Sequence, residues 1–306
     1  MIAESESPPI VVEDVHNQYG KTPVTHGVSF EVPDNSIFAL LGSNGSGKTT
    51  LIRTIVGIIR PSRGMTSVYG VPSGKLGREA FEKIGYAAEG QEIPLQYTLG
   101  GYLRYCKNMY PSWDDSFEEQ LLKMFQLPID RKLKHLSRGM LAKAQLITAM
   151  AHHPKLLILD EPFSGLDPLV LDEVIDALLD VTAQEKWTIF MSTHDVEEAE
   201  RLADRIGILN DGSLLACLRT DEILERFRRI QIPNTVVESP VQQQDRWLDF
   251  EQDENLISYV DSDFQDAEFE EWVSGLGMER KSIVVKPMTL REIATCVLRG
   301  RKSIQN

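Results

Sequence analysis

The amino-acid sequence predicts an α/β fold, in which a large domain with a mainly parallel sheet and an inserted helical segment precedes a small α+β domain. Three observations support this prediction. Short apolar runs alternate with stretches whose apolar residues recur at helical spacing, which is typical of parallel strands joined by helices. Between residues 98 and 153 the helical spacing continues without a convincing strand. Beyond residue 226 the alternation stops, and residues 238–254 are acidic and rich in glutamine.

The first half of the large domain alternates strands and helices around a glycine-rich turn. We expect strands at 10–15, 27–32, 36–41, 66–69 and 84–88, and helices at 48–59 and 78–83. Two helical stretches, 98–126 and 139–153, follow. They predict a helical subdomain that spans about residues 92–153.

The second half of the large domain returns to the α/β pattern. We expect strands at 155–159, 188–192 and 205–210, and helices at 169–184 and 196–203. The small domain should contain strands at 230–232, 256–260 and 282–285, and helices at 267–274 and 290–298. The predicted division is therefore 1–226 and 227–306, with a glutamine-rich linker in the second part. We expect the small domain to serve dimerisation or regulation.

Composition limits the function classes. The 32 basic against 46 acidic residues give a net charge of −14, which disfavours nucleic-acid binding. The three cysteines, Cys106, Cys217 and Cys296, lie far apart and predict reduced thiols. The amino terminus lacks a secretory signal, and no apolar run approaches the ~20 residues that span a bilayer. We therefore expect a cytoplasmic protein that reaches a membrane only through a partner.

A phosphate-binding loop follows the third expected strand. The segment Gly42-Ser43-Asn44-Gly45-Ser46-Gly47-Lys48-Thr49 matches G-x-x-x-x-G-K-[ST] and opens a helix, with Thr50 as the next residue. In such a loop the backbone amides surround phosphate oxygens, and the lysine reaches the β- and γ-phosphates. The threonine hydroxyl coordinates Mg²⁺. These residues predict a P-loop NTPase that binds ATP and Mg²⁺.

Two adjacent carboxylates end the apolar run 156–159. Asp160 is placed to coordinate Mg²⁺, either directly or through water, and Glu161 is placed to accept a proton from the attacking water. Together with the P-loop, this pair predicts nucleotide hydrolysis.

Three further motifs carry a resemblance to a known family. They are Leu136-Ser137-Arg138-Gly139-Met140, Ser164-Gly165-Leu166-Asp167 and Ser192-Thr193-His194-Asp195. In this order and spacing they look like the nucleotide-binding subunit of an ATP-binding cassette (ABC) transporter, over roughly residues 10–218. The bacterial ABC-2-type exporter ATPases look closest.

The resemblance implies a RecA-like core with an antiparallel β edge, and it assigns further roles. Tyr19 would stack on adenine and His194 would sense the γ-phosphate. Ser137 and the amide of Gly139 would bind the γ-phosphate held by another subunit, which implies a dimer around two ATP molecules. The second subunit would be another copy or a paralogous ABC subunit. A separate membrane permease would use the cycle for export, with the chain peripheral on the cytoplasmic face. The alternatives are a soluble ABC-type ATPase with a non-membrane partner and a regulatory ATP-binding subunit.

The sequence departs from the family pattern at two places. Arg138 and Met140 stand where Gly and Gln are usual in the signature. The position expected for the glutamine of the Q-loop, which would coordinate Mg²⁺, holds Glu89, and the nearest glutamine is Gln91. Either residue remains open for that role.

Six aromatic residues lie between the Q-loop and the signature. They are Tyr97, Tyr102, Tyr105, Tyr110, Trp113 and Phe117. We expect most of these side chains to form the core of the helical subdomain. The alternative is that some of them line a groove that receives a helix of a partner protein.

Overall fold

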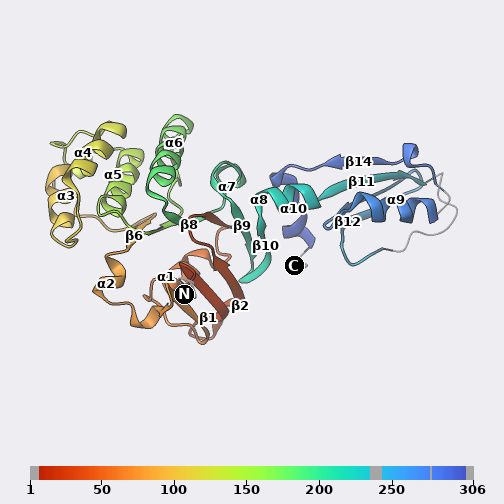
Figure 1. Cartoon of the computed structure of the whole chain (residues 1–306), viewed down its shortest axis with the longest axis horizontal. Helices are drawn as coiled ribbons and strands as arrows, with labels where there is room; N and C mark the ends of the chain where they lie inside the picture. Colours follow the sequence, from red (N-terminus) through yellow and green to blue (C-terminus); the bar gives the residue numbers. More distant parts are fainter. Residues whose placement is uncertain (1–6, 235–242, 276–277, 301–306) are drawn as a thin grey trace, which may run out of the picture.

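The computed structural model describes residues 7–234, 243–275 and 278–300. Figure 1 shows an elongated molecule with the helical subdomain at one end, the central sheet in the middle and the carboxy-terminal domain at the other end. Residues 1–6 of the acidic amino terminus and residues 235–242 of the expected linker lie outside the described residues.

A six-stranded sheet forms the centre of the large domain. Its spatial order is β10-β9-β3-β8-β7-β6; the five strands from β9 to β6 are parallel, and β10 is antiparallel to β9. Every residue of β3 and β7 is buried, as expected for parallel strands covered on both faces. The strands are β3 (Ile37–Leu41), β6 (Ile84–Ala88), β7 (Leu156–Asp160), β8 (Thr188–Thr193), β9 (Arg205–Asn210) and β10 (Ser213–Arg219).

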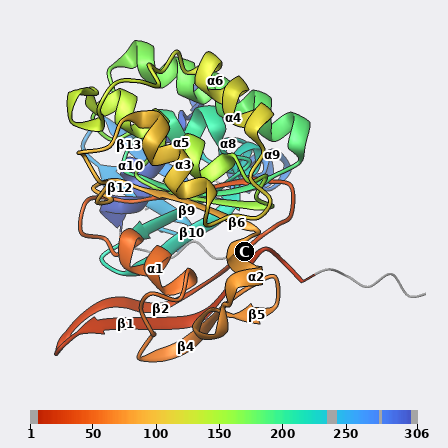
Figure 2. The same cartoon turned by 90° about the vertical axis from the view of Figure 1, so that its left-hand side faces the viewer.

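A second, antiparallel sheet lies on one side, as the lower layer in Figure 2. Its order is β2-β1-β4-β5, from β1 (Ile10–Tyr19), β2 (Thr22–Val32), β4 (Arg63–Val68) and β5 (Val71–Pro72). Helix α1 (Lys48–Ile55) shares one apolar cluster with both sheets, in which Phe30 and Phe38 stack with ring centroids 5.1 Å apart. The expected α/β class, parallel sheet and antiparallel edge are confirmed.

The helical subdomain consists of α3 (Leu99–Lys107), α4 (Asp115–Met124) and α5 (Arg138–Met150). The stretch expected to be helical over 98–126 is split, because α4 starts at a new cap, where the Asp114 side chain accepts from two backbone amides. Of the six aromatic residues, Tyr102, Trp113 and Phe117 are buried. Tyr97 and Tyr105 are exposed, and their rings stack on each other.

The remaining helices of the large domain flank the sheet. They are α2 (Arg78–Phe81), α6 (Pro168–Glu185), α7 (Val196–Leu202) and α8 (Thr220–Arg226). Strand β10 and helix α8 were not among the expected elements. No described helix combines the length and apolar character that a bilayer crossing requires.

The carboxy-terminal domain is a four-stranded antiparallel sheet with a helix against each face. Its order is β12-β13-β11-β14, from β11 (Arg228–Pro233), β12 (Trp247–Gln252), β13 (Leu256–Asp261) and β14 (Val284–Pro287). Helix α9 (Asp266–Gly275) shares an apolar cluster with Trp247, and α10 (Leu290–Gly300) shares another with Leu248.

The linker expected through residue 254 is wrong from residue 247 onward, because β12 begins there. Trp247 and Leu248 are both buried, on opposite faces of the sheet. A register shift between Leu248 and Glu251, with Asp249 at φ +45°, interrupts the alternation that would have revealed the strand in sequence.

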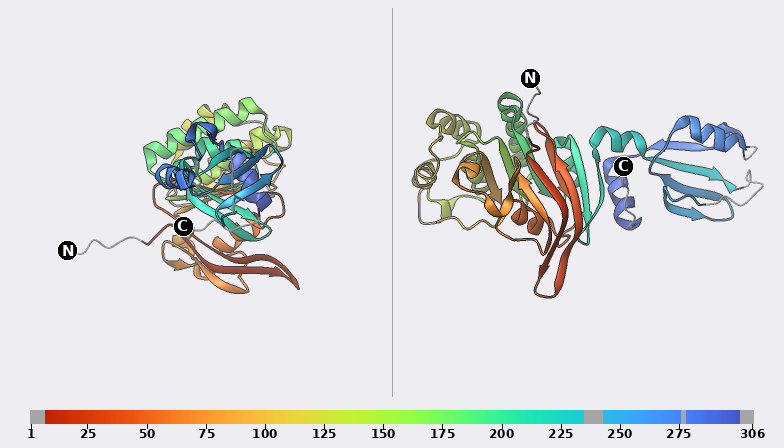
Figure 3. Two further views of the ribbon diagram at one scale, coloured as in Figure 1. Left: turned by 90° about the vertical axis from the view of Figure 1, so that its right-hand side faces the viewer. Right: turned by 60° about the horizontal axis from the view of Figure 1, so that its bottom comes forward.

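Helix α10 also packs against the large domain. Ile293 and Val297 are fully buried in the same cluster as Ala199 and Leu202 of α7. The helix therefore lies between the two domains (Figure 3).

Candidate active site

The P-loop connects β3 to α1, and two of its glycines are required by the geometry. A Cβ on Gly42 would lie 2.4 Å from the carbonyl oxygen of Leu209, so any side chain there would clash with the backbone of β9. Gly47 has φ +106°, a conformation that other residues rarely adopt. The loop thus reaches the amino end of α1, where backbone amides and the helix dipole favour an anion.

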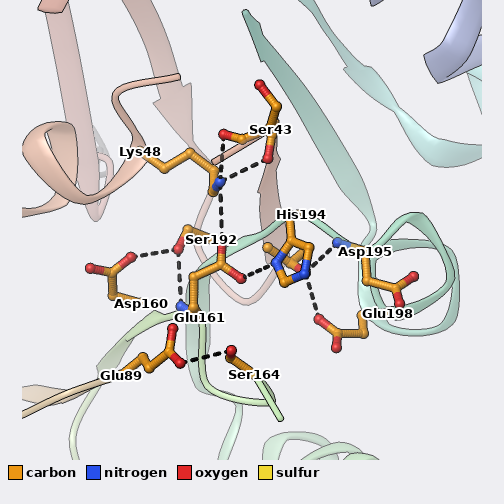
Figure 4. Close-up of polar contacts among 12 residues, drawn as sticks. Ser43, Lys48, Glu89, Asp160, Glu161, Ser164, Ser192, His194, Asp195 and Glu198 are labelled. Atoms are coloured by element: carbon orange, nitrogen blue, oxygen red, sulfur yellow. Dashed lines mark hydrogen bonds and ion pairs between the residues drawn. The ribbon is translucent and has the colours of Figure 1, made fainter. Parts of the chain in front are cut away.

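Lys48 is the first residue of α1, and its ammonium group is buried beside the loop. The Nζ atom donates to the carbonyl oxygens of Gly42 and Ser43 at 2.7 and 3.1 Å. It also lies 3.0 Å from Glu161 Oε1. A buried cation thus connects the phosphate-binding loop to the end of β7 (Figure 4).

Asp160 ends β7 and is 4% exposed. Its Oδ1 atom accepts from Thr49 Oγ1 at 3.1 Å and from Ser192 Oγ at 2.7 Å. A carboxylate beside a P-loop hydroxyl is a donor set that suits Mg²⁺, which typically takes one or two carboxylates in addition to substrate phosphates. The described residues contain no cluster of three or more metal-binding side chains.

Glu161 follows immediately and has an unusual backbone conformation. Its φ is +51°, and its amide donates to Ser192 Oγ at 3.0 Å. A left-handed conformation costs a non-glycine residue roughly 1–2 kcal/mol. Such strain clusters at active sites, where the surrounding structure maintains it.

His194 completes a row of three charged or polar groups across the site. Its Nδ1 atom lies 2.7 Å from Glu161 Oε2, while the other carboxylate oxygen faces Lys48. The Glu161 carboxylate is thus held between an ammonium and an imidazole group. This arrangement is suited to accepting a proton beside a phosphate group.

Sequence reasoning missed the positions of two neighbouring side chains. Ser192 was quoted only as part of a motif, yet it links Asp160 to the amide of Glu161. Glu198 on α7 is buried and accepts a hydrogen bond from Thr193 Oγ1. Burial raises the pKa of Glu198 to about 7. Its place four residues after His194 was the only available signal.

The structure does not bring all predicted site residues together. Tyr19 is half-exposed at the end of β1. Ser137 caps α5 by accepting from the Met140 amide at 3.2 Å, and Gly139 lies in the first turn of that helix, against Val170. Among the described residues, no hydrogen bond joins Ser137 or Gly139 to the P-loop.

A cavity of about 520 Å³ opens between the Q-loop and α5, and Glu161 lies in its wall. Gln91 is exposed and lines this cavity. Glu89 lines the same cavity, and its side chain accepts from Ser164 Oγ at 2.8 Å. The two alternatives for the Q-loop position therefore share one cavity, in which Glu89 is bound by Ser164.

Comparison with known proteins gives a consistent family. Residues 25–164 match the family model described as ABC transporter. The chain is 32% identical to the ABC transporter ATP-binding protein YtrB of Bacillus subtilis, over 68% of this chain and 71% of that protein. It is 37% identical to the Nod factor export ATP-binding protein I of Rhizobium meliloti, over 68% of this chain and 63% of that protein.

A solved ATP-binding subunit of an ABC transporter has a similar structure. It is 30% identical with a TM-score of 0.63, and the match covers 71% of this chain and 92% of that one. The matches to the two relatives and to the solved ATP-binding subunit cover the large domain, with its P-loop and acidic pair. The chain therefore belongs to the ABC transporter family, as an ATP-binding subunit that hydrolyses ATP.

Proposed function

We propose that the chain binds ATP with Mg²⁺, dimerises around two ATP molecules, and drives export through a separate ABC-2-type membrane permease. The observation that carries the catalytic part is the Glu161 carboxylate, held between Lys48 Nζ at 3.0 Å and His194 Nδ1 at 2.7 Å. The export part is supported by a relative whose name states Nod factor export.

The nucleotide would lie along the P-loop. The amides of residues 42–50 and Lys48 would bind its phosphates, and Tyr19 would stack on adenine. Thr49 and Asp160 would hold Mg²⁺, with Gln91 as a further ligand from the Q-loop. When bound, this ion neutralises charge on the β- and γ-phosphates.

In the reaction, Glu161 would accept the proton of the attacking water. Its two oxygens already face a cation and an imidazole ring, so the orientation of the carboxylate is fixed before the substrate binds. Lys48 and His194 would balance the charge that develops on the γ-phosphate.

The position of the signature supports a second subunit. Ser137 and Gly139 lie at the start of α5, in the helical subdomain, apart from the P-loop of their own chain. The amino end of this helix is exposed and favours an anion, so it would bind the triphosphate held by another chain. The partner would be a second copy or a paralogous ABC subunit.

The permease would dock beside the Q-loop. Leu95 lines the 520 Å³ cavity together with Gln91, and the exposed pair Tyr97 and Tyr105, whose rings stack on each other, follows Leu95 in the chain. Aromatic side chains are enriched in protein interfaces. Docking here would place the chain on the cytoplasmic face of the membrane and couple the permease to the ATP site.

The test of the catalytic assignment is Glu161→Gln. We expect kcat for ATP hydrolysis to fall by ~10²- to 10⁴-fold while ATP still binds, because the phosphate-binding loop is unchanged. Glu119→Gln, which removes an exposed ion pair with Lys123 on α4, is the control and should keep most of the activity. A Glu161→Gln variant with more than about a tenth of the wild-type kcat would refute the role of this carboxylate.

A further inference from the structure

The two departures from the family pattern lie together in space. Glu89 occupies the position where the resemblance suggests glutamine, and Arg138 the position where it suggests glycine, 49 residues further along the chain. Arg138 Nη2 lies 3.4 Å from Glu89 Oε1. The acidic substitution in one motif therefore faces the basic substitution in another.

The same carboxylate oxygen binds a third segment. Glu89 Oε1 accepts from Ser164 Oγ at 2.8 Å, in the loop that follows the acidic pair (Figure 4). The Arg138 guanidinium covers Gly165 in this loop so closely that a Cβ there would lie 2.9 Å from Arg138 Cζ. The Glu89 side chain thus connects the Q-loop with the loop after Glu161 and with the start of α5.

The backbone ties this cluster to the catalytic carboxylates. The Glu89 amide donates to the carbonyl oxygen of Asp160 at 2.8 Å, and the Ser164 amide donates to that of Glu161 at 3.2 Å. The backbone that carries the Glu89 side chain is therefore hydrogen-bonded to the end of β7. On the other side, Arg138 is the first residue of α5 and directly follows Ser137.

We propose that Glu89 is a positioning residue that holds the start of α5 in register with the Asp160–Glu161 end of β7. The inference rests on the proposed function, since the segment positioned is the one that would bind a second subunit's ATP. Glu89 and Arg138 stand where the family pattern has the uncharged residues glutamine and glycine. In this chain, therefore, the position of the signature relative to Asp160 and Glu161 depends on an ion pair.

The exposure of the pair sets the size of the effect. The side chains of Arg138 and Glu89 are 72% and 45% exposed, and exposed ion pairs change equilibria by up to about fivefold. Loss of the pair should therefore lower the melting temperature by no more than about 4 °C. The effect should be seen in the local order of α5 and in kcat.

The experiment is a double-variant cycle with Glu89→Gln, which preserves side-chain size, and Arg138→Gln, which removes the guanidinium group. In nucleotide-free protein, each single variant should speed hydrogen exchange of the backbone amides of residues 140–143 by up to about fivefold, and the double variant should add nothing further. Steady-state kcat should fall in the same pattern, with ATP affinity unchanged. Glu82→Gln, which removes the comparable exposed pair with Arg78 on α2, is the matched control and should leave both measurements unchanged.

The charge-reversed double variant Glu89→Arg/Arg138→Glu gives an independent check. It should restore slow exchange in nucleotide-free protein, where no triphosphate faces residue 138. Additive effects of the two single variants, or fast exchange in the reversed pair, would overturn the role of Glu89. If the wild-type protein hydrolysed no ATP, the proposed function would fail, while the exchange measurements would still decide this proposal.

Discussion

Replacing Glu198 with glutamine should stabilise the protein most strongly at alkaline pH. Glu198 is 8% exposed, and its carboxylate accepts from Thr193 Oγ1. Burial raises its pKa from the ordinary value of 4.5 to about 7, and the hydrogen bond from Thr193 opposes this rise. The carboxylates of Asp195 and Glu161 raise the pKa further, and His194 lowers it.

The sign of the pH dependence follows from proton binding. Between pH 4.5 and 7 the folded protein retains the Glu198 proton that the unfolded chain releases, so this group lowers the free energy of unfolding as the pH rises through that window. At ~1.4 kcal/mol per pKa unit, the full loss is at most about 3.5 kcal/mol, and about 1 kcal/mol of it is already present at pH 5. Glutamine does not ionise and avoids this loss.

Thermal unfolding of the wild type and the variant at pH 5 and pH 8 measures the effect. At ~2–4 °C per kcal/mol, Glu198→Gln should melt up to about 14 °C above the wild type at pH 8, and about 3 °C above it at pH 5. Glu200→Gln, an exposed change on the same helix, is the control. Variant and wild type must be compared at each pH, because burial lowers the pKa of His152 to about 4, and that group titrates with the opposite sign. Equal differences at both pH values would refute the buried-acid argument.

Three further outcomes are expected. Lys48→Ala should weaken ATP binding, measured by titration calorimetry, because it removes the buried cation beside the phosphate-binding loop; unchanged affinity would contradict the placement of the phosphates. Glu161→Gln protein should form a stable dimer on adding ATP, followed by light scattering, and a second change, Ser137→Arg, should block it by filling the space at the start of α5; a dimer that persists in the double variant would exclude this interface. Ile293→Ala should destabilise the large domain by about 2–5 kcal/mol in denaturant unfolding, because the fully buried side chain packs against α7, whereas the exposed Thr295→Ala should have little effect; equal effects would show that α10 does not support that domain.

Local sequence signals were sufficient to predict the elements that carry the P-loop and the acidic pair. The strand before Gly42, the helix that starts at Lys48 and the acidic end of β7 all lie where their patterns predict. Each depends on residues within one short segment: glycines that permit a tight loop, apolar runs that are buried on both faces, and polar residues at the strand end. Topology then brings separate strand ends to one edge of the sheet, which is why Asp160 and Ser192 meet.

The elements that the sequence did not reveal depend on contacts between distant segments. Strand β12 is acidic and contains a bulge, and it becomes visible only through the burial of Trp247 and Leu248 on opposite faces. Helix α10 was expected from the helical spacing of its apolar residues. Its packing on α7 could not be predicted, because an amphipathic pattern specifies an apolar face but not the element that covers it.

The Q-loop illustrates the same limit at a single residue. For the Q-loop position, counting along the chain selects Glu89, while the residue type expected there selects Gln91. Neither criterion takes into account that Arg138 lies nearby in space. Considered separately, Glu89 and Arg138 each look like the loss of a family feature. In the structure they face each other at 3.4 Å, with Ser164 on the same carboxylate oxygen, so each charge offsets the other. A departure from a motif is therefore best judged with its spatial neighbours, because a compensating change can lie 49 residues away.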